Sequence, residues 1–196
     1  MTVTQPHRTT RAIEIFCVLS LLSGCTVRQD TASSTVAAID TPDESLVKQS
    51  TALFERLSKL DGTFLVPTER ARTTYVTFEN ASRGGSIVET WRRKNEPVHS
   101  ITVFYRDQGV VYCRHYCPQG NQPILRLDSF DGTVAHFSLV TLTGDRDRAH
   151  MHLLTMEFPA SNDHVGVEEV YFTGDEPNPS AMRVFERVNE MVFDTN

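Results

Sequence analysis

The sequence predicts an all-β domain in which an antiparallel meander of about ten strands closes into a barrel, preceded by one N-terminal helix. From Gly62 onward, hydrophobic residues recur with the two-residue period of half-buried strands. Short turn signals such as Asp131-Gly132 separate these runs. A meander of this length hides its sheet edges by closing into a barrel, and a β-sandwich is the alternative.

The composition is that of one globular domain, which follows an N-terminal targeting segment. The chain has 196 residues, and 19 Lys and Arg against 25 Asp and Glu give a formal net charge of −6. This balance disfavours nucleic-acid binding, which needs a clustered basic surface. We predict three parts: a signal peptide at 1–24, a lipidated Cys with a flexible tether at 25–40, and the helix plus barrel at 41–196.

The first residues have the form of a secretory signal. Arg8 and Arg11 make a short basic region, and an apolar stretch over 12–22 follows, interrupted only by Glu14. It is too short to span a membrane and precedes small residues, as in a cleaved signal peptide. The next residues, Leu22-Ser23-Gly24-Cys25, resemble the lipobox of bacterial lipoproteins.

The lipobox resemblance implies cleavage before Cys25 and a diacylglycerol and palmitate membrane anchor on that residue. The lipid bilayer is then a partner of the chain through Cys25. Residue 26 is Thr rather than the Asp that tends to retain lipoproteins in the inner membrane. We therefore expect a bacterial cell-envelope protein, anchored in the outer membrane and facing the periplasm.

A helix is predicted before the strands. Thr41-Pro42-Asp43-Glu44 has the form of a capping box with Pro at the first helical position. Asp61-Gly62 ends the helix. Four leucines recur on one face: Leu46, Leu53, Leu57 and Leu60. This apolar face predicts a helix that covers the barrel.

The strand pattern also predicts which residues line the barrel interior. On 109–116, the smaller and less charged face carries Val111, Cys113 and His115. On 150–158 the inward face is expected to read His150, His152, Leu154, Met156 and Phe158. Four further charged residues alternate with hydrophobic neighbours and are placed inward: Glu89, Arg126, Glu169 and Arg183.

Two cysteines remain in the predicted barrel. Cys113 and Cys117 lie four residues apart on what reads as one strand. Their Cα atoms would then be about 13 Å apart, whereas a disulfide tolerates at most about 7 Å. We therefore predict no bond between them.

Two segments carry a family resemblance. His115 to Pro123 reads HYC-x-x-GNQP, and His150-Met151-His152 opens a late strand. Both are similar to segments of an uncharacterised bacterial family of lipocalin-like (calycin-type) domains. Leu60-Asp61-Gly62-Thr63-Phe64 resembles the L-x-G-x-W opening of such barrels, with Phe in place of Trp. The resemblance covers about residues 57–188, implies a lipocalin-like barrel and brings no established activity.

The leading functional hypothesis is a barrel that binds a small molecule. Its polar groups would fix a ligand among apolar side chains. The candidate ligand-binding residues are Glu89, His115, Cys117, Asn121, Arg126, His150, His152 and Glu169. No cofactor is required by the sequence, and the oligomeric state and protein partners are not predicted.

Three other hypotheses stay open. A metal or haem site could use His115, His150 and His152, because imidazoles two residues apart on one strand can reach one ion. An enzyme could pair Cys117 with His115 or a carboxylate with a His, although the sequence contains no complete catalytic motif, and we lean against catalysis. The same residues could instead only build turns and core in an interaction module.

Overall fold

The computed structural model describes residues 42–67, 74–93 and 96–189. The predicted signal peptide, Cys25 and the tether lie outside these residues. The elements are α1 (Glu44–Ser58), β1 (Gly62–Val66), β2 (Thr74–Ala81), η1 (Ser82–Gly84), β3 (Ser86–Arg93), β4 (Val98–Asp107), β5 (Val110–Tyr116), β6 (Asn121–Phe130), β7 (Val134–Gly144), β8 (His150–Glu157), β9 (His164–Thr173), β10 (Glu176–Pro177) and β11 (Arg183–Val188).

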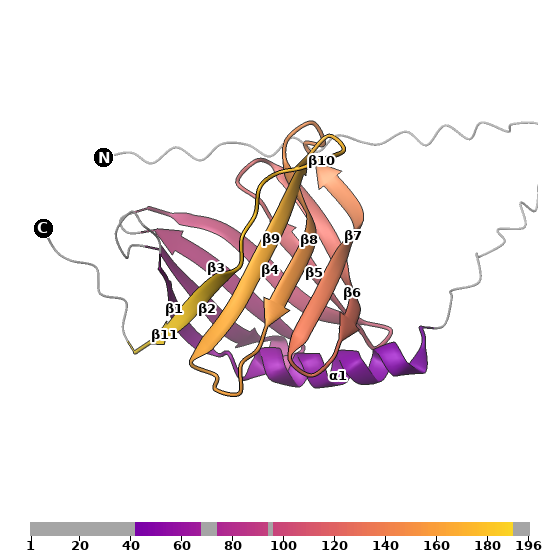
Figure 1. The fold of residues 1–196 in the computed structure, drawn as a ribbon, viewed down its shortest axis with the longest axis vertical. Helices are drawn as coiled ribbons and strands as arrows, with labels where there is room; N and C mark the ends of the chain where they lie inside the picture. Colours follow the sequence, from indigo (N-terminus) through magenta and orange to yellow (C-terminus); the bar gives the residue numbers. More distant parts are fainter. Residues whose placement is uncertain (1–41, 68–73, 94–95, 190–196) are drawn as a thin grey trace, which may run out of the picture. The chain divides into compact units, whose positions relative to one another are not determined.

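The sheet closes on itself. Neighbouring strands follow the order β9-β11-β1-β2-β3-β4-β5-β6-β7-β8, and the last strand, β8, pairs with the first, β9, which closes the barrel. All pairings are antiparallel, and β10 is an extra short strand on the edge of β9 (Figure 1). The prediction of an all-β meander that closes into a barrel with one N-terminal helix is confirmed, and the sandwich alternative is wrong.

Helix α1 starts slightly later than the sequence predicted. Asp43, rather than Thr41, is the N-cap, and its side chain accepts a hydrogen bond from the backbone N–H of Ser45 at 3.2 Å. A carboxylate at this position accepts a hydrogen bond from an otherwise unpaired N–H, and its negative charge interacts favourably with the positive end of the helix dipole. No described helix has the length and apolar character needed to cross a membrane.

The helix lies across one end of the barrel (Figure 1). Leu53 and Leu57 are fully buried there. The preceding turn also ties the helix to strand ends: Ser50 Oγ accepts from the backbone N–H of Val111 at 3.2 Å, and Gln49 Oε1 accepts from that of Phe130 at 2.8 Å. The helix therefore closes this end of the barrel with its leucines and satisfies backbone donors there with its polar side chains.

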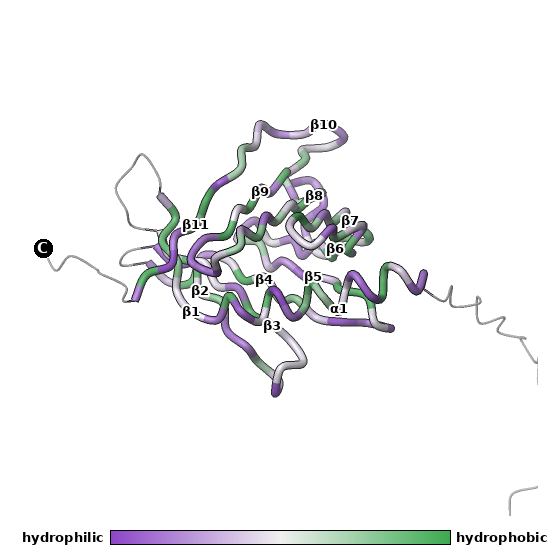
Figure 2. Tube along the Cα trace, turned by 60° about the horizontal axis from the view of Figure 1, so that its bottom comes forward, coloured by the Kyte–Doolittle hydropathy of each residue, from purple (hydrophilic) through white to green (hydrophobic). Residues whose placement is uncertain are grey.

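Large apolar side chains fill the barrel above the helix. Hydrophobic and hydrophilic residues alternate along the strands (Figure 2), which is the pattern of a sheet with one buried face. Phe64 packs edge-on to Phe78 with ring centroids 5.6 Å apart, and Phe104 packs on Phe137 at 6.2 Å. These rings close the interior between the helix and the opposite end.

Candidate functional site

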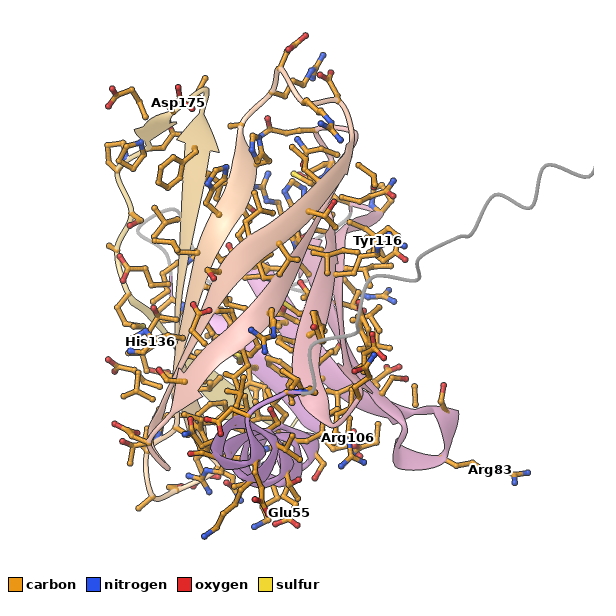
Figure 3. The ribbon with its side chains drawn as sticks, turned by 90° about the vertical axis from the view of Figure 1, so that its right-hand side faces the viewer. Glu55, Arg83, Arg106, Tyr116, His136 and Asp175 are labelled. Carbon is orange, nitrogen blue, oxygen red and sulfur yellow. The ribbon has the colours of Figure 1, made fainter. Side chains whose placement is uncertain are left out.

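A cavity of about 400 Å³ opens at the barrel end opposite α1. The course of β5 shows that the cavity and the helix lie at opposite ends of the barrel, because Val111 at the start of the strand contacts the helix and His115 at its end lines the cavity. In Figure 3, Glu55 on the helix marks one end of the barrel, and Asp175, which follows β9, marks the other. The cavity has the size of a small-molecule site.

Aromatic and apolar side chains form part of the cavity wall. Trp91, at the end of β3, is the single tryptophan of the chain and is 7% exposed. Its ring packs edge-on to Phe185 with centroids 5.3 Å apart. Tyr171 from β9 and Val66 from β1 also line the cavity. The apolar part of a ligand could pack against these side chains.

A charged pair stands beside Trp91. Arg183 donates a hydrogen bond from Nη2 to Glu169 Oε2 at 2.6 Å, and its guanidinium carbon lies 4.8 Å from the Trp91 ring centroid. Burial raises the pKa of Glu169, although the Arg183 charge acts in the opposite direction. Both contacts hold the guanidinium in one place at the cavity wall.

Glu89 lies deeper in the barrel, in the middle of β3. Its side chain is almost fully buried, and the residue is 3% exposed. Burial, followed by the nearby Glu169 charge, raises the pKa of Glu89 to about 8, against the opposing effects of Thr102 and Arg183. Glu89 therefore carries a proton at neutral pH and adds no negative charge beneath the cavity.

His115 is a neutral group in the cavity wall. Its Nδ1 lies 3.0 Å from Thr102 Oγ1 and its Nε2 lies 3.2 Å from the Tyr171 hydroxyl, so both ring nitrogens have hydrogen-bond partners. Burial, and then the charge of His99, lowers the pKa of His115 to about 4. The ring thus positions the Tyr171 hydroxyl at neutral pH rather than carrying charge.

The two cysteines in the described part of the chain, Cys113 and Cys117, are free thiols. Cys113 is buried below the cavity and Cys117 lines it. Burial raises the pKa of each thiol, so the weakly nucleophilic protonated form dominates at neutral pH. Because His115 has its ring nitrogens on Thr102 and Tyr171, it does not pair with Cys117. This geometry disfavours the thiolate–imidazole hypothesis.

The prediction that His150 and His152 line the interior is wrong. His152 is the extra residue of a β-bulge, because Met151 pairs with Tyr171 while Leu153 pairs with Val170. The bulge turns Met151 inward. His152 instead stacks on Phe172, with centroids 4.2 Å apart, and its Nε2 lies 2.8 Å from His150 Nε2.

The structure therefore does not bring His115 together with His150 and His152. Among the residues it describes, no group of three or more His, Cys, Asp or Glu side chains could hold a metal ion. His150 has a different role: its Nδ1 lies 2.9 Å from the backbone carbonyl of Arg148, at the start of β8. The two histidines form a packed pair at the strand end.

Two further candidates lie away from the cavity. Arg126 was placed inward, and this is wrong: Leu125 and Leu127, its neighbours on β6, are the fully buried residues. Asn121 is buried but anchors a turn. Its side-chain Nδ2 donates a hydrogen bond to the Ala149 carbonyl, and its backbone carbonyl accepts one from the Cys117 N–H, each at 3.1 Å.

Of the eight candidates, three therefore line the cavity, namely His115, Cys117 and Glu169, while Glu89 lies beneath it. The sequence interpretation missed the residues of the cavity mouth: Arg92, Arg93 and His99. For His99, a second bulge explains this, because Trp91 pairs with Ser100 while Arg92 pairs with Val98. His99 is then the extra residue, and two-residue alternation does not predict where such side chains point.

Comparison with known proteins adds no family to the evidence from the fold. Neither a protein-family model nor a curated protein matches the chain. The closed antiparallel barrel is consistent with a lipocalin-like fold. Membership of the family suggested by the HYC-x-x-GNQP and His-Met-His segments stays a prediction.

Proposed function

We propose that this protein is a bacterial envelope lipoprotein whose barrel binds a small molecule in the cavity at its open end. The cavity itself carries the proposal: about 400 Å³, bounded by aromatic rings and by polar groups held in place. A barrel plugged at one end by a helix and hollow at the other suits a binding role.

The membrane anchor is a separate part of this proposal and rests on sequence. Lipidation of Cys25 would hold the barrel at the outer membrane, with 26–40 as a tether on the periplasmic side. Metabolic labelling with radioactive palmitate tests it. We expect label on the wild-type chain and none on the Cys25→Ala variant; equal labelling of both would contradict the anchor.

Native mass spectrometry of the full chain released from cell envelopes tests the binding proposal. We expect a non-covalent added mass on the wild-type protein. Ser100→Phe, which places a ring into the cavity wall, should lose that mass. Val140→Phe adds the same ring at a position that is 56% exposed and away from the cavity, and should keep the mass.

Melting temperatures of the three proteins verify that each is folded before the masses are compared. No added mass on folded wild-type protein, or the same added mass on all three, would contradict binding in the cavity.

A further inference from the structure

The charged groups that line the cavity are unbalanced. Among the residues that the structure describes, three guanidinium groups line it, from Arg92, Arg93 and Arg183, against the single carboxylate of Glu169. His99 lies in the same lining. The whole chain carries a formal net charge of −6, so the described cavity lining is positive within an acidic protein. A partly enclosed site lined by one sign of charge concentrates ligands of the opposite sign.

Arg183 is held in position before any ligand arrives. The Glu169 contact at 2.6 Å uses one of the five N–H donors of a guanidinium, and the Trp91 ring lies 4.8 Å from its central carbon. Held between a carboxylate and a ring, this side chain has less conformational entropy to lose on binding. Its other donors match the two oxygens of a carboxylate.

Arg92 and Arg93 differ from Arg183 because no carboxylate neutralises them within the described part of the chain. Neither forms an ion pair there. Both side chains are exposed and lie in the cavity lining next to Trp91. They sit where the barrel opens, because β3 ends at Arg93. This places two uncompensated positive charges at the entrance of an aromatic cavity.

We propose that the cavity binds a small organic carboxylate, with the anionic group on the arginines and the apolar part against Trp91 and Tyr171. This inference rests on the proposed function and specifies the chemical class of its ligand. The volume of about 400 Å³ restricts the ligand to a small molecule. A cationic ligand would meet the arginines and is excluded by the same charges.

Three probes of one shape separate charge from fit: benzoate, benzamide and benzamidine, which are anionic, neutral and cationic. The full chain in phosphatidylcholine vesicles is titrated with each, and Trp91 fluorescence reports binding because it is the only tryptophan of the chain. We expect benzoate to bind at least about tenfold more tightly than benzamide, as for a charge-assisted hydrogen bond. Benzamidine should bind most weakly.

Variants at the mouth test which charges act. Arg92→Gln with Arg93→Gln removes two exposed charges and should bring benzoate affinity to within about threefold of benzamide affinity, because the long-range attraction is lost. The matched control, Arg83→Gln, removes an exposed charge from the η1 turn at the start of β3, far from the cavity (Figure 3). It should leave the benzoate preference unchanged.

The outcomes distinguish the two proposals. Benzamide binding as tightly as benzoate would overturn the carboxylate inference and leave small-molecule binding in place. An unchanged preference in the double variant would also overturn it, because the arginines would then not select the ligand. No binding of any probe, together with no added mass on the wild-type chain, would overturn the proposed function and this inference with it.

Discussion

The two ends of the barrel are built from the same strands but have opposite character. Along β5, Val111 and Cys113 near the helix are apolar and fully buried, whereas His115 at the other end is a polar cavity group. Along β9, Val165 and Val167 give way to Glu169 in the same way. The change from core to site thus occurs within single strands, on one inward face.

This contrast separates stability from function. Burial of apolar surface at the helix end stabilises the fold by about 25 cal/mol per Å². At the open end, desolvation of Glu89 and Glu169 opposes folding, since burial raises the pKa of both. Truncations at the helix end should therefore destabilise the fold without changing binding, whereas substitutions of the polar groups at the cavity end should change binding and can even stabilise the fold.

The largest expected effect is at the helix end. Leu57→Ala should lower the free energy of unfolding by about 2–5 kcal/mol, because it leaves a hole under a fully buried side chain. Thr51→Ala on the exposed side of α1 is the control and should change it little. Urea unfolding measures both. A loss of benzoate binding by folded Leu57→Ala would break the separation of the two ends.

Glu89→Gln should stabilise the protein at neutral pH. The wild-type carboxyl has a pKa of about 8 when folded against 4.5 in the unfolded chain, so folding at pH 7 includes uptake of a proton. Wild-type stability should therefore fall as pH rises from about 4.5 to 8, by about 3 kcal/mol at pH 7.

Glu89→Gln should remove the Glu89 contribution to this slope and leave the smaller one of Glu169, and Glu55→Gln on the exposed helix surface should retain the whole slope (Figure 3). Urea unfolding across the pH range measures the three proteins. Parallel pH profiles for wild type and Glu89→Gln would show that Glu89 is ionised in the fold.

The Glu169–Arg183 pair should show coupling. Arg183→Gln leaves Glu169 buried without its partner, and its cost should exceed that of the double variant Glu169→Gln with Arg183→Gln. A coupling energy of about 1–3 kcal/mol is expected, reduced from that of a fully buried pair because the Arg183 side chain is 38% exposed. A double-mutant cycle measures it; additive effects would contradict the pairing.

The smallest effect is expected at His152. Its ring stacks on Phe172 and does not line the cavity, so His152→Ala should cost under about 1 kcal/mol and leave benzoate affinity unchanged. Titration with benzoate, followed by Trp91 fluorescence, provides the measurement. A large loss of affinity would restore the earlier hypothesis that this histidine faces the ligand.

Much of the fold follows from sequence periodicity, and the bulges mark where that periodicity stops. The inward face of β5 was predicted correctly because that strand keeps a regular register through His115. On β8 the residues beyond the bulge, Leu154 and Met156, also point inward as predicted. His152 could not be placed, because one extra residue reverses the face of everything before it.

The positive cavity mouth was hidden from sequence for a related reason. Arg92 and Arg93 read as an exposed pair close to a turn, which is common on any surface. Only closure of the barrel brings them beside Arg183, which is far away in the chain. Arg126, by contrast, was placed inward on the evidence of Ile124 alone, although it also shares its face of β6 with Asp128 and the opposite face carries Leu125 and Leu127.

Collisional quenching of Trp91 tests the central claim most directly, because it measures the charge of the open end without any knowledge of the ligand. The full chain in phosphatidylcholine vesicles is quenched with iodide and with caesium, and each result is normalised to free N-acetyltryptophanamide. A positive cavity predicts that iodide quenches Trp91 several-fold more than caesium and that Arg92→Gln with Arg93→Gln reduces this ratio. Equal normalised quenching, or a preference for caesium, would contradict a carboxylate-binding cavity at this end of the barrel.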